Sequence, residues 1–326
     1  MKRVIYENSI KEFKNKIFST YFGDMSYTVF DIETLGLSPH KHPMILGGFC
    51  YFDEKATCVQ YFADNPDEEN EILSESIEEL QNFDVVITFN GSSFDLPFIK
   101  KRAEILGLEA NNLPYHLDLY TVLRKFSDLK KFLPNMKQKT VETFAGLSDR
   151  TDAISGKKSI DYYFEYINTA NLNLKTDILL HNSDDVFQLY RLLPILKKTD
   201  FHRAMMDLGF PVKTDSGICI VTDIIIKGEK LSIRGITKNS KEEQIVFSDF
   251  TDYRIGSDET FSTSISLNSF NDCLIADVGK IDLSNSPISS LPTFYDGYLV
   301  LKDNQQVYPF EINMLAKILT ERIFAV

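Results

Sequence analysis

The sequence has no long apolar run. No stretch approaches the ~20 consecutive apolar residues that a membrane helix needs, and the N-terminal segment Met1–Asn8 carries charge but has no apolar segment behind it. We therefore expect neither a membrane span nor a secretory signal, and we place the protein in the cytoplasm.

Cysteine is also scarce. The four cysteines, Cys50, Cys58, Cys219 and Cys273, form no C-x-x-C pair, which excludes a zinc knuckle and a dithiol redox motif. Cys50 and Cys58 flank a predicted turn, so one arrangement is a disulfide across a hairpin. The other, which we expect, is that all four are buried free thiols in a reducing compartment.

Positive charge is in deficit. The 35 lysines and arginines are outnumbered by 47 acids, which gives a net charge of −12. This balance excludes a histone-like or generally basic nucleic-acid binder, but it does not exclude an enzyme with a local basic groove. Segment 124–139 is locally basic and contains Lys130 and Lys131. These lysines either hold a phosphate backbone or form an ordinary solvated surface.

The 326 residues, 43% of them hydrophobic, are enough for about two domains with real cores. Segments 27–33, 44–52, 56–62 and 84–89 have the composition of strands, and 67–81 and 93–106 have helical spacing. We also expect a polar helix at 7–17, mainly helical structure over 115–200, and a long amphipathic helix at 176–197. This order predicts an α/β domain over residues 1–208, with a mixed sheet covered by helices.

After about residue 210 the sequence changes to short strand-like segments separated by turn residues. We expect residues 209–326 to form a smaller β-rich accessory domain that ends in a helix at 311–324. It contains no motif that we can assign, so it is either a substrate platform or a surface for a protein partner.

Three polar motifs interrupt this apolar framework. Asp31 and Glu33 are two residues apart on a predicted strand, so they point to the same face. They are either an ordinary solvated strand end or two ligands that share a cation, and the depletion of aspartate in strands makes the pair notable.

The second motif, residues 90–99, follows a buried strand and opens a helix. Ser92 or Ser93 is the expected N-cap and Asp95 falls in the first turn, where an acid is favoured. Asp95 therefore either stabilises the helix end or faces a metal. Asn90 either fixes the turn or contacts a substrate.

The third motif is the polar cluster from His181 to Asp185 in a leucine-rich helix. Serine, aspartate and asparagine are unfavourable in mid-helix. His181 and Asp185 are four residues apart and share a face, so they either stabilise an exposed helix face or belong to a site. We expect Asp184 to face solvent or to lie behind the site.

In chain order these motifs read D-x-E, N-x-x-x-F-D and H-N-x-x-D. Together they resemble the DEDD exonucleases of the ribonuclease H-like superfamily, and most closely the YprB-like family and the proofreading domain of family-B DNA polymerases. The resemblance covers residues 22–197 and is supported by segments 115–119, 139–142 and 149–156. It implies a ribonuclease H-like mixed sheet flanked by helices.

The resemblance also implies that Asp31, Glu33, Asp95 and Asp185 hold metal ions, for which their hard oxygen atoms suit two Mg²⁺ or Mn²⁺. His181 stands four residues before the final acid, where one subclass has tyrosine, whereas the histidine subclass has its histidine five before. It is either a general base or a group that positions the water or the phosphate. The substrate contacts that we expect are Thr34, Leu35, Asn90, Phe94, Lys130 and Lys131.

We therefore expect a metal-dependent 3′–5′ exonuclease that acts on a single-stranded end of DNA or RNA. One alternative is a structure-selective endonuclease. Another is a catalytically weakened nucleic-acid-binding or scaffold protein, which the acidic charge and the altered third motif favour and the retention of all four acids disfavours.

Overall fold

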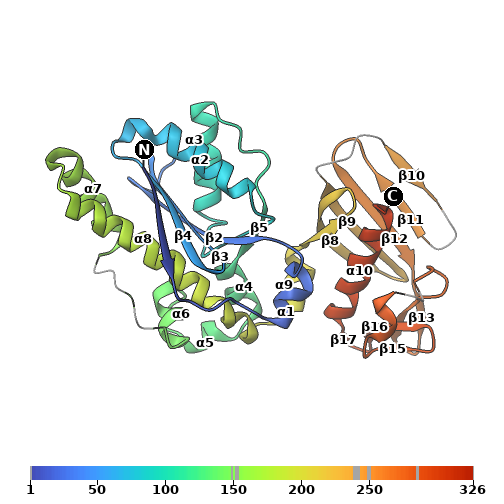
Figure 1. Cartoon of the computed structure of the whole chain (residues 1–326). Helices are drawn as coiled ribbons and strands as arrows, with labels where there is room; N and C mark the ends of the chain where they lie inside the picture. The colour runs from blue at the N-terminus through green and yellow to red at the C-terminus, as the bar shows by residue number, and fades with distance from the viewer. Residues whose placement is uncertain are drawn as a thin grey trace. The chain divides into compact units, whose positions relative to one another are not determined.

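The computed structural model describes residues 2–147, 150, 154–237, 243–247, 251–283 and 286–325. Contacts divide the chain into two compact units, Met1–Thr199 and Asp200–Val326 (Figure 1). This division lies before helix α9 (Phe201–Leu208), which packs on α10 and β8, whereas the sequence analysis ended the first domain at residue 208. A nuclease role for the first domain and an accessory role for the second remain predictions. In the supporting segment 149–156, residues 149 and 151–153 lie outside the described residues.

The first unit contains a six-stranded mixed sheet in the order β1-β4-β3-β2-β5-β6. Its strands are β1 (Lys2–Asn8), β2 (Tyr27–Thr34), β3 (Met44–Asp53), β4 (Lys55–Phe62), β5 (Val85–Thr88) and β6 (Tyr115–Asp118). Strands β2, β5 and β6 are parallel, while β1, β4, β3 and β2 pair antiparallel. The carboxyl ends of β2, β5 and β6 therefore meet at one edge of the sheet, where ligands bind in open α/β sheets.

Helices cover both faces of this sheet, which confirms the predicted α/β fold. The helices of this unit are α1 (Lys16–Phe22), α2 (Glu69–Gln81), α3 (Asp95–Leu106), α4 (Leu119–Phe126), α5 (Leu129–Phe132), α6 (Gln138–Phe144), α7 (Gly156–Thr169) and α8 (Leu172–Leu192), with short 3₁₀ turns at Pro66–Glu68 and Leu193–Lys198. Side chains of α2 and α3 form one core against the sheet, and side chains of α7 and α8 form the other.

Two local predictions are wrong, and one needs a small addition. Residues 7–17 do not form a helix, because β1 continues to Asn8 as an edge strand on β4 and Asn15 caps the helix that starts at Lys16. Residues 115–200 are mainly helical, as predicted, but they begin with β6, whose four residues are too few to show a strand pattern. Helix α3 starts at Asp95 after Phe94, so neither Ser92 nor Ser93 is its N-cap.

The second unit is rich in strands, as predicted. Strands β10-β11-β12-β9-β8-β7 form an antiparallel sheet with bounds Gln244–Val246, Thr251–Ile255, Thr260–Ser266, Lys230–Thr237, Gly217–Lys227 and Phe210–Thr214. A smaller sheet contains β13 (Asn268–Phe270), β14 (Cys273–Asp277), β15 (Phe294–Tyr295), β16 (Tyr298–Asp303) and β17 (Gln306–Val307). Helix α10 (Pro309–Ile323) packs on β7 and β8 of the first sheet and on β16 of the second. A 3₁₀ turn spans Pro287–Ser290.

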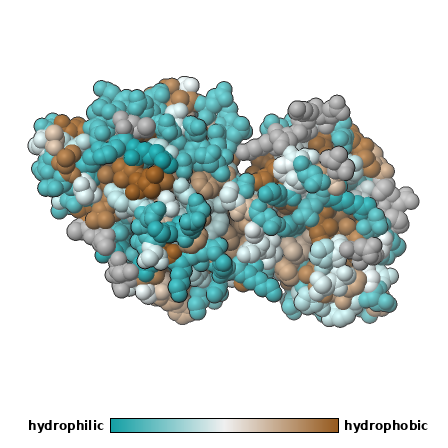
Figure 2. All heavy atoms as spheres, in the orientation of Figure 1, coloured by the Kyte–Doolittle hydropathy of each residue, from teal (hydrophilic) through white to brown (hydrophobic). Residues whose placement is uncertain are grey.

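Polar residues dominate the surface seen in Figure 2, with smaller hydrophobic areas between them. All four cysteines are free, as expected, although Cys273 is only partly buried. Cys50 and Cys58 are paired in register on β3 and β4 without a disulfide. Among the residues that the structure describes, no helix combines the length and the apolar character that crossing a membrane requires.

Candidate active site

The two acids of the first motif lie on β2, at the sheet edge where three parallel strands end. Asp31 pairs with Gly48 and Glu33 with Leu46 of the neighbouring strand β3. Asp31 is partly exposed, whereas Glu33 is only 8% exposed. Because they are two residues apart on one strand, both carboxylates point to the same side of the sheet.

Asp95 brings a third carboxylate to the same strand. It is the first residue of α3 and is 5% exposed. Its Oδ1 accepts a hydrogen bond of 3.2 Å from the backbone N–H of Ile32, which lies between Asp31 and Glu33 in the chain. The acid of the second motif therefore binds the strand of the first motif, in addition to occupying a favourable helix end.

Helix α8 supplies the third motif. The Nε2 atom of His181 lies 3.7 Å from Oε1 of Glu33 and 3.6 Å from Oδ2 of Asp185. Glu33, His181 and Asp185 each offer a ligand atom, and these atoms all lie within 4.8 Å of one another. His181 is 4% exposed, so the i,i+4 pair faces the sheet and does not form an exposed helix face.

A residue that the sequence analysis gave no role, Asn182, joins α8 to the first motif. Its Nδ2 donates a 3.0 Å hydrogen bond to Oδ2 of Asp31. Its Oδ1 accepts a 2.8 Å hydrogen bond from Gln60 Nε2, which also donates to the Leu179 carbonyl. A Cβ atom on Gly48 would lie 1.9 Å from Asn182 Oδ1, so only glycine leaves room for this side chain. Asp31 therefore has a fixed orientation.

A buried ion-pair network holds Asp185 from its other side. Arg150 forms two 2.7 Å hydrogen bonds to the carboxylate of Glu142 and a short one to Oδ1 of Asp185. Gln138 Nε2 donates to Glu142 Oε1 at 2.9 Å and to the Asp185 carbonyl at 3.0 Å. This network ties α6 to α8. Its members lie in a predicted helical region, but their sequence spacing gives no signal that they meet.

Burial raises the pKa values of all four acids, and repulsion by the other acids of the cluster adds to the rise for Asp31 and Glu33. Burial is the largest cause in each case, and it raises the pKa of Glu33 to about 8 and that of Asp95 to about 7. The pKa of Asp31 is raised well above its ordinary value, also because Asp95, Asp185 and Glu33 repel its charge. Burial raises the pKa of Asp185 too, although His181 and Arg150 oppose the rise. Such a cluster favours a bound cation or bound protons.

The residues that we expected to contact a substrate lie in different environments in the structure. Thr34 is buried and donates to the Gly36 carbonyl at 2.9 Å, and Leu35 packs against the core beside α7 and α8. Phe94 packs against the core on the opposite face and contacts Phe98. Asn90 adopts a left-handed backbone with φ of 72° and its N–H donates to Asp118, so it does fix the turn.

Lys130 and Lys131 are exposed on α5, and Lys131 pairs with Asp128 at 2.6 Å. Within the described residues, no hydrogen bond or ion pair connects either lysine to the acids. Lys137, from the same basic segment, instead lines a hollow together with Asn90.

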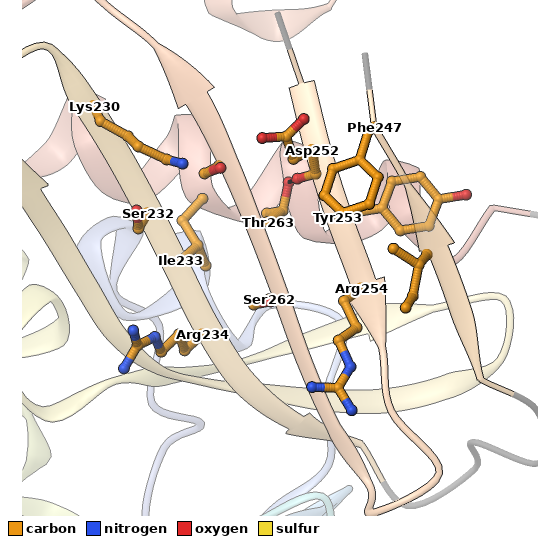
Figure 3. Close-up of a pocket in the computed structure, with 12 residues that line it drawn as sticks. Lys230, Ser232, Ile233, Arg234, Phe247, Asp252, Tyr253, Arg254, Ser262 and Thr263 are labelled. Atoms are coloured by element: carbon orange, nitrogen blue, oxygen red, sulfur yellow. Dashed lines mark hydrogen bonds between the residues drawn. The ribbon is translucent and has the colours of Figure 1, made fainter.

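A second hollow, of about 360 Å³, lies on the open face of the six-stranded sheet in the second unit (Figure 3). Arg234 and Arg254 stand on either side of Ser262, with which both are in register. Asp252 lines the same hollow, and Arg254 is paired with Glu243 at 2.9 Å. Because these carboxylates offset the cationic groups, the hollow has little excess positive charge with which to attract a polyanion.

Comparison with known proteins shows to which family the chain that forms this site belongs. The sequence profile described as the RNase_H superfamily matches residues 28–197, just over half of the chain. The DNA polymerase of Methanocaldococcus jannaschii is 27% identical over 169 residues, covering 40% of this chain and 10% of that protein. The DNA polymerase of Pyrococcus glycovorans is 36% identical over 98 residues, covering 26% of this chain and 12% of that one.

The uncharacterized protein YprB of Bacillus subtilis is 27% identical over 167 residues, covering 50% of this chain and 40% of YprB. The chain therefore spans well under half the length of these relatives. Among solved structures, the family B DNA polymerase of Pyrobaculum calidifontis aligns with a TM-score of 0.43 and 18% identity, covering 53% of this chain and 25% of the polymerase.

Proposed function

The chain belongs to the RNase_H superfamily, and from this premise we propose that it is a metal-dependent nuclease that hydrolyses the phosphodiester bonds of DNA or RNA. We propose further that it acts as a 3′–5′ exonuclease on a single-stranded end. The observation that carries this proposal is the convergence of Asp31, Glu33, Asp95 and Asp185, brought from β2, α3 and α8 to one edge of the sheet.

The side chains present fit divalent metal ions. Four carboxylates offer hard oxygen atoms, which suit Mg²⁺ or Mn²⁺ better than the mixed nitrogen and sulfur sets typical of structural zinc. Burial raises the pKa values of Asp31, Glu33 and Asp95, and a bound cation would favour their charged forms. In the proposed site Asp31, Glu33, Asp95 and Asp185 hold two ions. Such ions, when bound, make water more acidic and stabilise charge on the leaving oxygen of a phosphodiester.

The surrounding residues orient this site. Asn182 fixes the carboxylate of Asp31, and Arg150 fixes that of Asp185. The imidazole of His181 points between Glu33 and Asp185, where its Nε2 atom is placed either to accept a proton from an attacking water or to hydrogen-bond it. In either role His181 would act through its Nε2 atom, so both roles require this side chain to lie beside Glu33 and Asp185.

The proposal is tested with end-labelled single- and double-stranded DNA and RNA in the presence of Mn²⁺. A ladder that shortens from the 3′ end is the expected result. Internal cuts would show an endonuclease instead, and binding without cleavage of any substrate would show a weakened, nucleic-acid-binding protein.

Asp31→Ala should abolish cleavage, because it removes a ligand that contacts the proposed metal ions. Asp161→Ala removes an exposed acid from α7 of the same unit and should leave the rate unchanged. Full cleavage by Asp31→Ala would refute the assignment of the site. A protein partner for the second unit and a cytoplasmic location remain predictions that this experiment does not address.

A further inference from the structure

The larger sheet of the second unit is covered on one face and open on the other. Helices α9 and α10 pack on β8, and α10 also packs on β7. The ring of Phe261 on β12 contacts that of Phe324, just after α10, with centroids 5.3 Å apart. On the opposite face lie the hollow of about 360 Å³ described above and a second one of about 350 Å³. The two hollows adjoin, because Arg234, Arg254 and Ser262 line both.

Side chains on the open face form two rows that run across the strands. The first row consists of Arg234, Ser262 and Arg254, on β9, β12 and β11. The second row lies two residues along each of these strands and consists of Ser232, Ser264 and Asp252. Because the side chains of a strand alternate between its faces, both rows point to the same side (Figure 3). On β11 each row therefore ends in a charge, positive for Arg254 and negative for Asp252.

The charges on this face are balanced. The charged residues that line its hollows are Lys230, Arg234, Arg254, Asp223 and Asp252. Glu243 pairs with Arg254 at 2.9 Å, so three cations are matched by three acids. That pair is about half exposed and therefore weak, so Arg254 can exchange Glu243 for a different carboxylate. A face with one sign of charge would repel its own copy, whereas a balanced face can match it.

Exposed apolar side chains border the two rows. Ile236 lies on the same face of β9 as Arg234, and Ile245 of β10 is in register with Arg254. Phe247 lines the larger hollow together with Ile245. These three apolar side chains are 44%, 52% and 80% exposed in the order Ile236, Ile245 and Phe247. Apolar side chains that gather on one exposed face indicate a surface that binds another protein.

We propose that this face binds the same face of a second copy of the chain, so that the two sheets stack about a two-fold axis. The axis lies between the sheets and runs across the strands, midway between the two rows. It places each residue of the first row opposite a residue of the second row of the other copy. Such a contact uses one surface patch twice, as two-fold interfaces do. This association is independent of the nuclease function proposed above.

The two rows are complementary under this axis. Arg254 faces Asp252 of the second copy, and the symmetry repeats this ion pair. Ser262 faces Ser264 of the second copy, and each hydroxyl can both donate and accept a hydrogen bond. Because serine is small, the sheets can approach to the spacing of about 10 Å at which stacked sheets pack. An axis along β12 would instead set Arg254 against Arg234, so the charges select the axis across the strands.

The test measures the mass of the whole chain in solution by sedimentation equilibrium over a range of protein concentrations. For the wild-type protein we expect a reversible equilibrium between monomer and dimer. Arg254→Asp sets two acids against each other in the dimer, and Asp252→Arg sets two arginines against each other. Because like charges that face each other oppose association strongly, each substitution should raise the Kd of the dimer by about 100-fold or more.

Mixing the two variants separates an interface from a fold defect. In a mixed dimer each acid of the Arg254→Asp chain faces an arginine of the Asp252→Arg chain, so both ion pairs are restored. The equimolar mixture should therefore dimerise at concentrations where each variant alone is monomeric. Lys302→Asp, which reverses an exposed charge on β16 of the smaller sheet, is the matched control and should dimerise as the wild-type protein does.

A wild-type protein that stays monomeric at every concentration its solubility allows would overturn the proposal. A dimer that persists unchanged in both Arg254→Asp and Asp252→Arg would also overturn it, because that dimer must use another surface. If the two variants are monomeric and remain so when mixed, the two-fold arrangement of the rows is wrong.

Discussion

At the residue scale, the site depends on side chains whose roles only the three-dimensional structure makes visible. Spacing predicts that Asp31 and Glu33 share one face of a strand and that His181 and Asp185 share one face of a helix. That these residues and Asp95 belong to one candidate site follows from the resemblance of the three motifs to the DEDD exonucleases. Asn182 could not be given a role, because its partners Gln60 and Asp31 are 122 and 151 residues away. The one available signal is an unfavourable mid-helix asparagine.

Gly48→Ala tests the orienting role of Asn182. The new methyl group would lie 1.9 Å from Asn182 Oδ1, so the amide must move away from Asp31. Loss of a hydrogen bond behind a metal ligand typically weakens metal binding by about 10- to 100-fold. We expect a weakening in this range in a calorimetric Mn²⁺ titration.

Gly156→Ala is the control, since a Cβ there meets no atom within 4 Å. It should bind Mn²⁺ as the wild-type protein does. Equal Mn²⁺ affinity in Gly48→Ala and Gly156→Ala would contradict the role of Asn182.

At the scale of elements, most strands and helices of the first unit follow from hydrophobic periodicity. Strand β1 does not, because nearly all its residues are exposed on an edge and show no alternation. Strand β6 is four residues long and leads directly into α4. The hydrogen bonds and ion pairs that connect α6 to α8 have no sequence signal either, because Gln138 and Arg150 reach Asp185 from 47 and 35 residues away in the chain.

Glu142→Ala should destabilise this attachment. The Glu142 and Arg150 side chains are 2% and 13% exposed, so the substitution removes a carboxylate from a buried guanidinium that still pairs with Asp185. Breaking a buried pair costs about 3 kcal/mol of unfolding free energy, which urea denaturation can measure.

The exposed pair of Lys131 and Asp128 provides the comparison, because its side chains are 73% and 71% exposed. Asp128→Ala should cost less than about 1 kcal/mol. If the two variants lose the same free energy, the Arg150 network does not stabilise the fold.

At the scale of the whole molecule, an excess of twelve negative charges first argues against a nucleic-acid substrate. The structure weakens this argument, because four of the acids lie together in one buried cluster. The mixed sheet of the first unit could be predicted from the order of its elements. The fold of the second unit could be predicted only as rich in strands, because short strands of similar composition do not specify which of them pair.

The acid cluster makes the stability of the metal-free protein depend on pH. The pKa of Glu33 rises from 4.5 to about 8 and that of Asp95 from 3.8 to about 7. Between these limits the folded protein holds protons that the unfolded chain has released, so stability falls as pH rises. In EDTA, we expect the Tm to decrease between about pH 5 and pH 8.

Millimolar Mn²⁺ should raise the Tm, and more so at pH 8 than at pH 5, because the ions replace the protons. Glu33→Gln, which cannot ionise, should show a shallower decrease in EDTA when followed by circular dichroism. A metal-free Tm that climbs across this window would contradict the raised pKa values, and no response to Mn²⁺ would contradict the metal site.

The contact between Gly48 and Asn182 also constrains how this sequence can evolve. Any larger residue at position 48 collides with the amide at 182, and a residue that lacks the amide at 182 leaves Asp31 without its donor. A change at either position alone therefore disturbs the site, whereas a small residue at 182 would open the space above 48. We expect these two positions, separated by 134 places in the chain, to vary together across the family, with a larger residue at 48 found only where position 182 carries a smaller side chain.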